Sequence, residues 1–344
     1  TPARISRVSP GLKPHTANHP CTQISFVWFC LKNTGLVSQM ETEVLVQAER
    51  LTRYYDRNCA VRNVSFQLNK GDVLGFLGPN GAGKSTTMQM ITGNLAPSAG
   101  KVSIEGVDLL DSPKKAKGNI GYLPETPPLY RDYTVDEFLY YCARLHRVPR
   151  NRIRGAVGTA QERCGLDSVR DRLIGNLSKG FQQRVGIAQA ILHSPPVVIL
   201  DEPTVGLDPI QIREIRTLIR ELGREHGIIL STHILPEVQA TCNRVQIINQ
   251  GCLVYSDTTE CLEQQLHGNT LIAAFNAPPS LDEISAIPGV TGIDQLPDQR
   301  LRIHYENGRN PAETIAEEAV AGHWRIFELS PERRSLEQIF IELT

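Results

Sequence analysis

The residues from Gly78 to Thr86 have the types and the spacing to hold a nucleoside triphosphate. They fit the phosphate-loop pattern G-x-x-x-x-G-K-[ST], in which successive backbone N–H groups surround the phosphates. Lys84 would reach the β- and γ-phosphates, and the hydroxyl of Ser85 would bind Mg²⁺. The candidate binding residues of this loop are Gly78, Pro79, Asn80, Gly81, Ala82, Gly83, Lys84, Ser85 and Thr86.

The elements that must position this loop are also evident in the sequence. The apolar residues Val73–Leu77 predict a strand before the loop, and a helix is expected to begin near Lys84 and to run through Met88 and Met90. The positive end of the helix dipole would then face the phosphates. A glycine-rich turn that fits the pattern by chance is the alternative, and the strand–loop–helix context argues against it.

A second stretch, Val197–Thr204, combines an apolar run with two adjacent carboxylates. Its apolar residues predict a buried parallel strand, which ends at Asp201 and Glu202. Asp201 would hold Mg²⁺ directly or through water, whereas Glu202 would orient and polarise an attacking water. A strand that ends in a solvated acidic turn is the alternative. The nearby phosphate loop favours the catalytic interpretation.

A third stretch, Leu177–Arg184, opens a helix whose later apolar positions would be buried. Ser178 is expected to cap this helix, and Gly180 lets the backbone come close to an anion. The segment lies just ahead of the strand that ends at Asp201. It resembles the signature motif of ATP-binding-cassette (ABC) ATPases, which is usually written LSGGQ.

The resemblance to ABC ATPases assigns further residues in chain order. Tyr55 lies where an aromatic ring stacks on adenine, and Glu125 lies at the Q-loop position beside the metal and the phosphates. Gly206–Asp208 matches the D-loop, and His233 matches the switch histidine that contacts the γ-phosphate. The resemblance covers residues 44–257 strongly and the C-terminal end more weakly.

Three positions depart from the pattern of that family. Glu125 replaces the Q-loop glutamine; its carboxylate can still bind Mg²⁺ or water, but it adds a negative charge beside the phosphates. Lys179 replaces a glycine of the signature, and Phe181 replaces its glutamine. Lys179 would place a cation near the nucleotide of a partner subunit. None of these changes removes a group that hydrolysis needs.

The resemblance also implies a fold and a mechanism. The fold would be an α/β P-loop ABC ATPase domain with a mixed sheet and a helical subdomain. Two copies would meet head to tail, so that Ser178 and Gly180 of one cover the ATP and Mg²⁺ bound at Lys84 of the other. Glu202, His233 and Lys84 would be the catalytic residues, with Ser85, Asp201 and Glu125 at the metal.

The chain is expected to contain three regions. Residues 40–257 would form the ATPase domain, with the helical subdomain at about 126–176. Within that subdomain, Thr126–Tyr130 would line the groove that grips a permease; an ordinary proline-rich loop is the alternative. Residues 1–39 contain no Asp or Glu and are expected to form a disordered extension, with a transit peptide as the alternative.

The region 258–344 is expected to form a small α+β domain. Its strand and helix patterns follow the order β-α-β-β-α-β, which is typical of a ferredoxin-like unit. The ending Ser335–Thr344 resembles the last helix of drug-type and gliding-type ABC ATPases. Before this region, Pro209–His226 predicts a long helix with charges on one side.

Composition narrows the class of function. The net charge is −1, so no nucleic-acid partner is expected, and the eight scattered cysteines indicate reduced thiols in a cytosolic protein. No segment approaches the roughly 20 apolar residues of a membrane helix. A permease is therefore expected on another chain. This subunit would then lie in the cytoplasm at the inner face of the membrane. An energising subunit of a membrane transporter is therefore the favoured function, and the resemblance is closest to the ATP-binding subunits of multidrug-type or gliding-type exporters. The alternatives are a soluble ABC ATPase that acts on ribosomes or DNA, and a nucleotide-dependent binding module without turnover, against which Glu202 argues.

Overall fold

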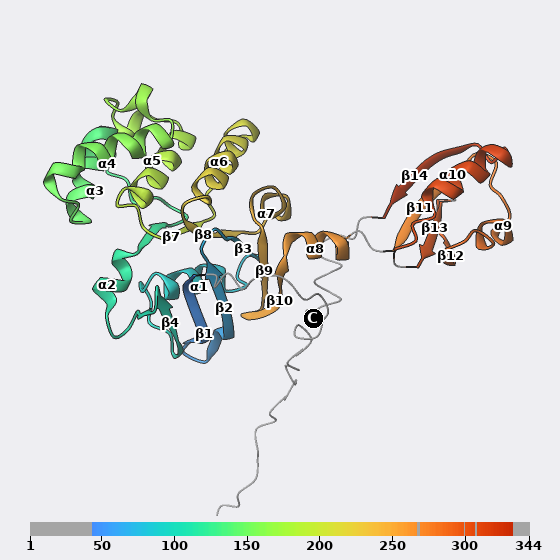
Figure 1. The fold of residues 1–344 in the computed structure, drawn as a ribbon, viewed down its shortest axis with the longest axis horizontal. Coiled ribbons are helices and arrows are strands. Elements are labelled where there is room, and N and C mark those ends of the chain that lie inside the picture. The colour runs from blue at the N-terminus through green and yellow to red at the C-terminus, as the bar shows by residue number, and fades with distance from the viewer. Residues whose placement is uncertain (1–42, 267–268, 299, 307, 333–344) are drawn as a thin grey trace, which may run out of the picture. The chain divides into compact units, whose positions relative to one another are not determined.

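The computed structural model describes residues 43–266, 269–298, 300–306 and 308–332 (Figure 1). The expected extension at residues 1–39 and the expected last helix Ser335–Thr344 lie outside the described residues. Within the described part of the chain, none of the helices combines the length and the apolarity that a bilayer crossing requires.

A six-stranded sheet forms the centre of the first domain, in the order β10-β9-β3-β8-β7-β6. Its strands are parallel except for β10, which pairs antiparallel with β9 at the edge. All residues of β3, β7 and β8 are buried, as their continuous apolar runs predict for inner parallel strands. The strands are β3 (Val73–Leu77), β6 (Ile120–Leu123), β7 (Val197–Asp201), β8 (Gly227–Thr232), β9 (Arg244–Asn249) and β10 (Cys252–Thr258).

An antiparallel sheet of order β2-β1-β4-β5 covers one side of this centre. The helix α1 (Lys84–Ile91) contributes Met88 and Met90 to the shared core, and the ring of Phe66 in β2 lies 5.7 Å from that of Phe76 in β3. These contacts fix the loop between β3 and α1. The strands are β1 (Val44–Tyr55), β2 (Asn58–Asn69), β4 (Ala99–Ile104) and β5 (Val107–Asp108).

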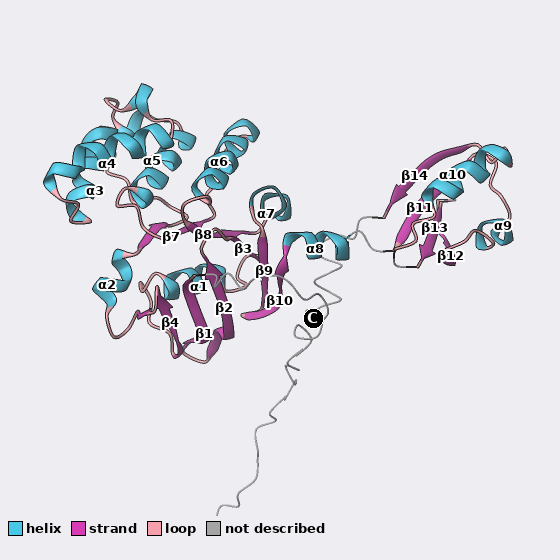
Figure 2. Cartoon of the chain, in the orientation of Figure 1, coloured by secondary structure: helices cyan, strands magenta, loops and turns pink. Residues whose placement is uncertain are grey.

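Helices pack against the other face of the central sheet and share a second core with it (Figure 2). Thr134 and Glu137 form a capping box at the start of α3, and Asp208 caps α6 through the backbone N–H groups of Ile210 and Gln211. The helices are α3 (Val135–Leu145), α4 (Arg150–Arg163), α5 (Lys179–Ile191), α6 (Pro209–Leu222) and α7 (Leu235–Thr241), and the short α2 (Pro113–Gly118) precedes β6. The predicted α/β fold with a mixed sheet is confirmed, and α3 and α4 lie in the 126–176 stretch where helices are expected.

Two boundaries differ from the sequence prediction. The helix expected to reach His226 ends at Leu222, because Gly223 caps it and the buried His226 ring instead places Nδ1 2.6 Å from the carbonyl oxygen of Pro195. Beyond β10, the helix α8 (Thr259–Leu266) contacts β9 and β10, and Leu262 belongs to the core of the first domain. The first domain therefore includes residues after Thr258.

A third sheet follows, with all its strands antiparallel and in the order β12-β13-β11-β14. Its own small core includes Phe275 and Trp324, whose rings meet edge to face. The element order is the β-α-β-β-α-β series predicted from the sequence. The elements are β11 (Thr270–Phe275), α9 (Leu281–Ser285), β12 (Val290–Gln295), β13 (Leu301–Tyr305), α10 (Ala312–Ala321) and β14 (Ile326–Pro331).

Candidate functional site

The loop between β3 and α1 is shaped for close contact with an anion. Gly83 has φ 107°, and a Cβ at this position would lie 2.7 Å from the carbonyl oxygen of Ala60, so only glycine fits. No side chain caps the start of α1. The first N–H groups of the helix are therefore directed at the loop, where a phosphate can accept from them.

Lys84 is held beneath this loop with only 5% of its surface exposed. Its Nζ donates to the carbonyl oxygens of Gly78 at 2.8 Å and Pro79 at 3.3 Å. The same Nζ lies 3.4 Å from Oε1 of Glu202. One buried ammonium group thus joins the phosphate loop to the carboxylate at the end of β7.

A cavity of about 400 Å³ opens at this point. It brings together side chains from the phosphate loop, the Q-loop position, the end of β7 and the turn after β8, which lie far apart in the sequence. Its lining consists of Ala60, Asn80, Gly81, Gly83, Lys84, Ser85, Thr86, Glu125, Glu202, Val205 and His233. The candidate residues Lys84, Ser85, Glu125, Glu202 and His233 thus face one cavity.

Glu202 is the most constrained residue of the cavity. It is 7% exposed and has φ 50°, a conformation that is strained for a residue with a side chain. Its backbone N–H donates to the carbonyl oxygen of Ser231 at 3.0 Å, and its Oε2 lies 3.0 Å from Nδ1 of His233. Its two carboxylate oxygens therefore have different neighbours, Lys84 on one side and His233 on the other.

Asp201, one residue earlier, has the features of a metal ligand. Burial raises its pKa, and the nearby hydroxyls of Ser231 and Ser85 and the ammonium of Lys84 oppose that shift. Its Oδ1 is buried without a hydrogen-bond partner among the described residues. An unpaired carboxylate oxygen beside the Ser85 hydroxyl is a set of hard oxygen donors that fits Mg²⁺.

Several predicted binding residues lie outside the cavity lining. Tyr55 ends β1 and is 43% exposed, and the guanidinium carbon of Arg53 lies 5.0 Å from the centroid of its ring. Gly78, Pro79 and Ala82 contribute backbone to the loop, and the N–H of Ala82 already donates to the carbonyl oxygen of Pro79. Adenine stacking on Tyr55 stays a prediction.

The signature residues also lie outside the cavity of their own chain. Ser178 is exposed and caps α5 by accepting from the backbone N–H of Phe181. Gly180 packs so closely on Gln211 of α6 that a Cβ would lie 2.6 Å from its side chain. The Nζ of Lys179 lies against Gly206 of the same chain, where an added Cβ would meet it.

Sequence reasoning missed one buried carboxylate. Glu237 of α7 is 1% exposed and accepts from the hydroxyls of Thr204 at 2.5 Å and Thr232 at 2.6 Å. Thr204 follows Glu202 by two positions, and Thr232 directly precedes His233. Glu237 therefore ties together the two segments that carry the catalytic candidates. The only signal in the sequence is a glutamate one helical turn after the histidine, which is too common to single out.

Replacing Glu237 by Gln tests this connection. We expect the free energy of unfolding to fall by about 1–3 kcal/mol, because a buried amide cannot accept from both threonine hydroxyls as the carboxylate does. The turnover number should fall while the affinity for ATP stays unchanged, since the phosphate loop is untouched. Urea unfolding and steady-state kinetics measure both quantities. Glu214→Gln, which alters the half-exposed partner of Arg184, is the control, and an unchanged turnover number in Glu237→Gln would contradict the role.

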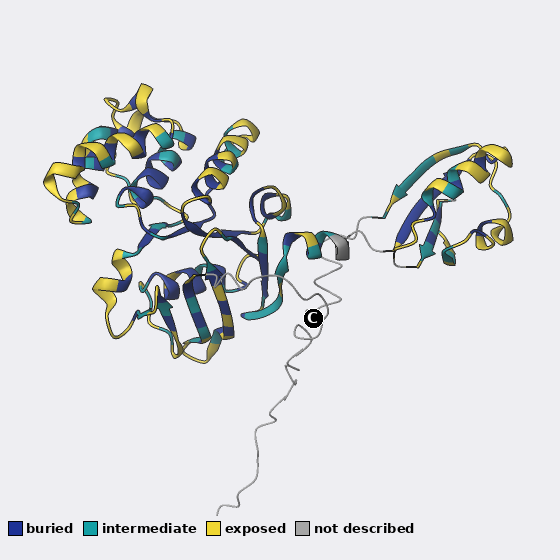
Figure 3. Ribbon diagram, viewed as in Figure 1, coloured by how far each residue is buried: buried dark blue, intermediate teal, exposed yellow. Residues whose placement is uncertain are grey.

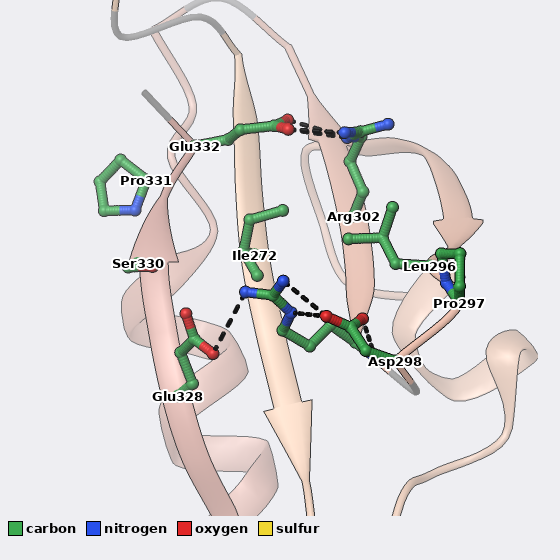
Figure 4. A pocket seen from close by; sticks show the side chains of 10 residues that line it. Ile272, Leu296, Pro297, Asp298, Arg302, Glu328, Ser330, Pro331 and Glu332 are labelled. Carbon is green, nitrogen blue, oxygen red and sulfur yellow. Dashed lines mark hydrogen bonds and ion pairs between the residues drawn. The ribbon is translucent and has the colours of Figure 1, made fainter. Parts of the chain in front are cut away.

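A larger cavity, of about 710 Å³, lies on the third sheet (Figure 4). Its charged side chains neutralise one another. Arg300 pairs with Asp298 and Glu328, and Arg302 holds Glu332 through two nitrogens. The cations and carboxylates of this cavity pair with one another, whereas the candidate catalytic residues Lys84, Glu202 and His233 line the cavity at the phosphate loop.

Comparisons with known proteins confirm the expected ABC ATPase fold. Residues 61–205 match the family described as ABC transporter. The chain is 41% identical to the ABC transporter ATP-binding protein NatA of Bacillus subtilis over 63% of its own length and 89% of that protein. It is 30% identical to the linearmycin resistance ATP-binding protein LnrL of the same species over 87% of its length and 98% of that protein. Among solved structures, CbiO1 of Clostridium perfringens, described as part of the ABC transporter complex CbiONQ, is 30% identical with a TM-score of 0.60 over 65% of this chain and 92% of that one.

Proposed function

The chain belongs to the family of ABC transporter ATP-binding proteins, and we propose that two copies enclose ATP head to tail to drive a separate membrane permease. ATP hydrolysis is the activity of this family. One observation supports the head-to-tail pair of two copies. Lys84, Glu202 and His233 face one cavity, whereas the exposed Ser178 lies outside it on the same chain.

The residues of the cavity divide the chemistry of hydrolysis between them. The phosphate loop binds the triphosphate through its backbone N–H groups, and Lys84 neutralises charge on the β- and γ-phosphates. Glu202 orients a water molecule and takes its proton as the water oxygen bonds to the γ-phosphorus. The bond from that phosphorus to the β–γ bridging oxygen breaks, which leaves ADP and phosphate. His233 holds the carboxylate of Glu202 through the 3.0 Å contact. Ser85 and Asp201 would hold Mg²⁺, with Glu125 nearby, and that ion would neutralise phosphate charge.

In the proposed pair, the second copy supplies groups that the cavity lacks on its own chain. The start of α5 offers the exposed hydroxyl of Ser178 and the backbone N–H groups beside it, whereas the α-carbon of Gly180 is packed on Gln211. In a head-to-tail pair these groups reach the γ-phosphate bound by the other copy. ATP then joins the two copies, and hydrolysis releases them.

The partner in the membrane is proposed from the printed descriptions of relatives. CbiO1 is described as part of a transporter complex, and LnrL as a resistance ATP-binding protein. We infer a permease on another chain, export as the direction, and a location at the inner face of the membrane. A membrane protein encoded by the neighbouring gene would support this inference, and a ribosomal or repair neighbour would contradict it.

Mixing two inactive variants tests the head-to-tail pair. Ser178→Arg should retain ATP binding but lose turnover, and Lys84→Ala should lose ATP binding. Neither variant alone should hydrolyse ATP. Their mixture should recover activity, because a mixed pair has one site with an intact Lys84 and an intact partner Ser178. Phosphate release measures the recovery.

The control substitution is Ser280→Arg. Ser280 caps α9 as Ser178 caps α5, with the same 3.4 Å bond to a backbone N–H, so both substitutions remove an exposed cap. Ser280→Arg should keep normal turnover. A mixture of Ser178→Arg and Lys84→Ala that stays inactive would refute the head-to-tail arrangement.

A further inference from the structure

A second cavity, of about 640 Å³, lies between α2, β6 and the end of α3, away from the phosphate loop. Its lining includes Lys117 of α2 and His146, which caps α3, and contains no carboxylate. The ring of His146 stacks on that of His193 with centroids 4.0 Å apart, which fixes the end of α3 beside the cavity. Lys117 and His146 thus bring two segments of the chain to the same cavity, namely α2 and the turn that follows α3.

Basic side chains stand on both sides of the cavity. We use the term basic rim for six residues around the cavity: Lys114, Lys115, Lys117, Arg144, Arg147 and Arg150. All six are exposed, as is most of the surface of α2 and of the turn from α3 to α4 (Figure 3). From residue 138 to residue 161 the chain has five arginines and no Asp or Glu. The rim is therefore a concentrated positive surface on a chain whose net charge is −1.

The members of the basic rim have no ion-pair partner among the described residues, so their charges are available to an external anion. Arg163, Arg184 and Arg244 each pair with a carboxylate at 3.0 Å or less. Arg150 begins α4, whose first turn has no acidic residue and no side-chain cap. A cation at the positive end of a helix opposes the helix dipole and destabilises the fold slightly. The position of Arg150 thus gives the fold no electrostatic gain, and its charge is available to an external anion.

Exposed leucines accompany the charges. Leu110 precedes α2 and is 55% exposed, and Leu145 ends α3 and is 62% exposed. Cations combined with exposed leucines are typical of surfaces that lie at the interface of an anionic bilayer, where the charges meet headgroups and the leucines enter the acyl boundary. A nucleic-acid surface needs the charges and stacking aromatics but not the leucines.

We propose that the basic rim, with Leu110 and Leu145, rests on anionic phospholipid headgroups at the membrane face. The inference rests on the proposed function in one respect, since the permease brings the chain to a membrane. Each basic side chain near such a surface adds to the attraction, and the attraction weakens with salt. The rim then adds a second attachment, which helps to orient the ATPase beneath its permease.

Flotation of the full chain with vesicles, without nucleotide, tests the proposal. We expect the wild type to float with phosphatidylcholine vesicles that contain phosphatidylglycerol, and not with vesicles of phosphatidylcholine alone. Arg144→Glu combined with Arg147→Glu should lower binding by about tenfold or more. The matched control is Arg220→Glu with Arg224→Glu, because these arginines occupy the last turn of α6 and the second position after its end, as Arg144 and Arg147 do for α3.

Equal binding by the rim variant and the α6 variant would overturn the proposal, as would equal binding to both kinds of vesicle. Lys114→Glu with Lys115→Glu gives an independent measure from the other side of the cavity, should the arginine variant fold poorly. A single-stranded RNA arm addresses the rival partner. RNA binding that the rim variant loses, without vesicle binding by the wild type, would assign the surface to nucleic acid and overturn the lipid inference. The mixing experiment on Ser178 and Lys84 uses no lipid, so failure of the proposed function is distinguishable from failure here.

Discussion

Glu202→Gln is expected to lower ATP turnover by about 10²–10⁴-fold while ATP binding is retained. The substitution keeps the shape of the side chain but removes the proton acceptor at the end of β7. The contacts that hold the phosphates, through the loop and Lys84, are unchanged. With binding intact and hydrolysis blocked, ATP should keep two copies joined, so an ATP-bound dimer should accumulate.

Phosphate release and size-exclusion chromatography with ATP measure the two outcomes. Glu225→Gln is a suitable control. Glu225 is an exposed carboxylate that pairs with Arg163, and neither residue lines the cavity at the phosphate loop. A Glu202→Gln protein that stays monomeric and turns over ATP at the normal rate would rule out the role assigned to Glu202.

Lys84→Ala should lower the affinity for ATP by roughly 100-fold or more, because hydrogen bonds to a charged group contribute about 1.5–3 kcal/mol each and Lys84 would make several to the phosphates. The substitution also leaves Oε1 of the buried Glu202 without its cation. We therefore expect both weaker binding and a lower melting temperature of the nucleotide-free protein.

Isothermal titration with ATP, and thermal unfolding without it, measure these effects. Lys70→Ala provides the comparison, since Lys70 is 65% exposed and pairs only with Glu43 on the surface. Near-normal ATP affinity in Lys84→Ala would show that the phosphate loop is assigned wrongly.

The predictable part of the site is the part encoded in short segments. The phosphate loop could be recognised because one continuous run supplies the strand, the turn and the helix start. The meeting of Glu202 and His233 could also be anticipated. Their strands β7 and β8 are parallel and adjacent, with β8 next to β3, and the carboxyl ends of such strands share one edge of the sheet.

The unpredicted part depends on tertiary contacts. Glu237 looks like any glutamate on a short helix until Thr204 and Thr232 are seen to donate to it. The contact of the His226 ring with the carbonyl oxygen of Pro195, beyond the end of α6, also joins residues that are far apart in the sequence. Leu262 could be assigned to the first core only from the packing of α8, since its sequence resembles an ordinary linker helix. Such pairings join residues that no local pattern connects.

The contact between Lys84 and Glu202 has a consequence for the order of events in hydrolysis. The ammonium group that would bind phosphate lies 3.4 Å from the carboxylate that would take a proton from water. Phosphate oxygens and this carboxylate would compete for one cation, so contacts from Lys84 to phosphate are expected to make Glu202 a stronger base. Nucleotide binding and proton abstraction are therefore expected to be coupled through a single side chain.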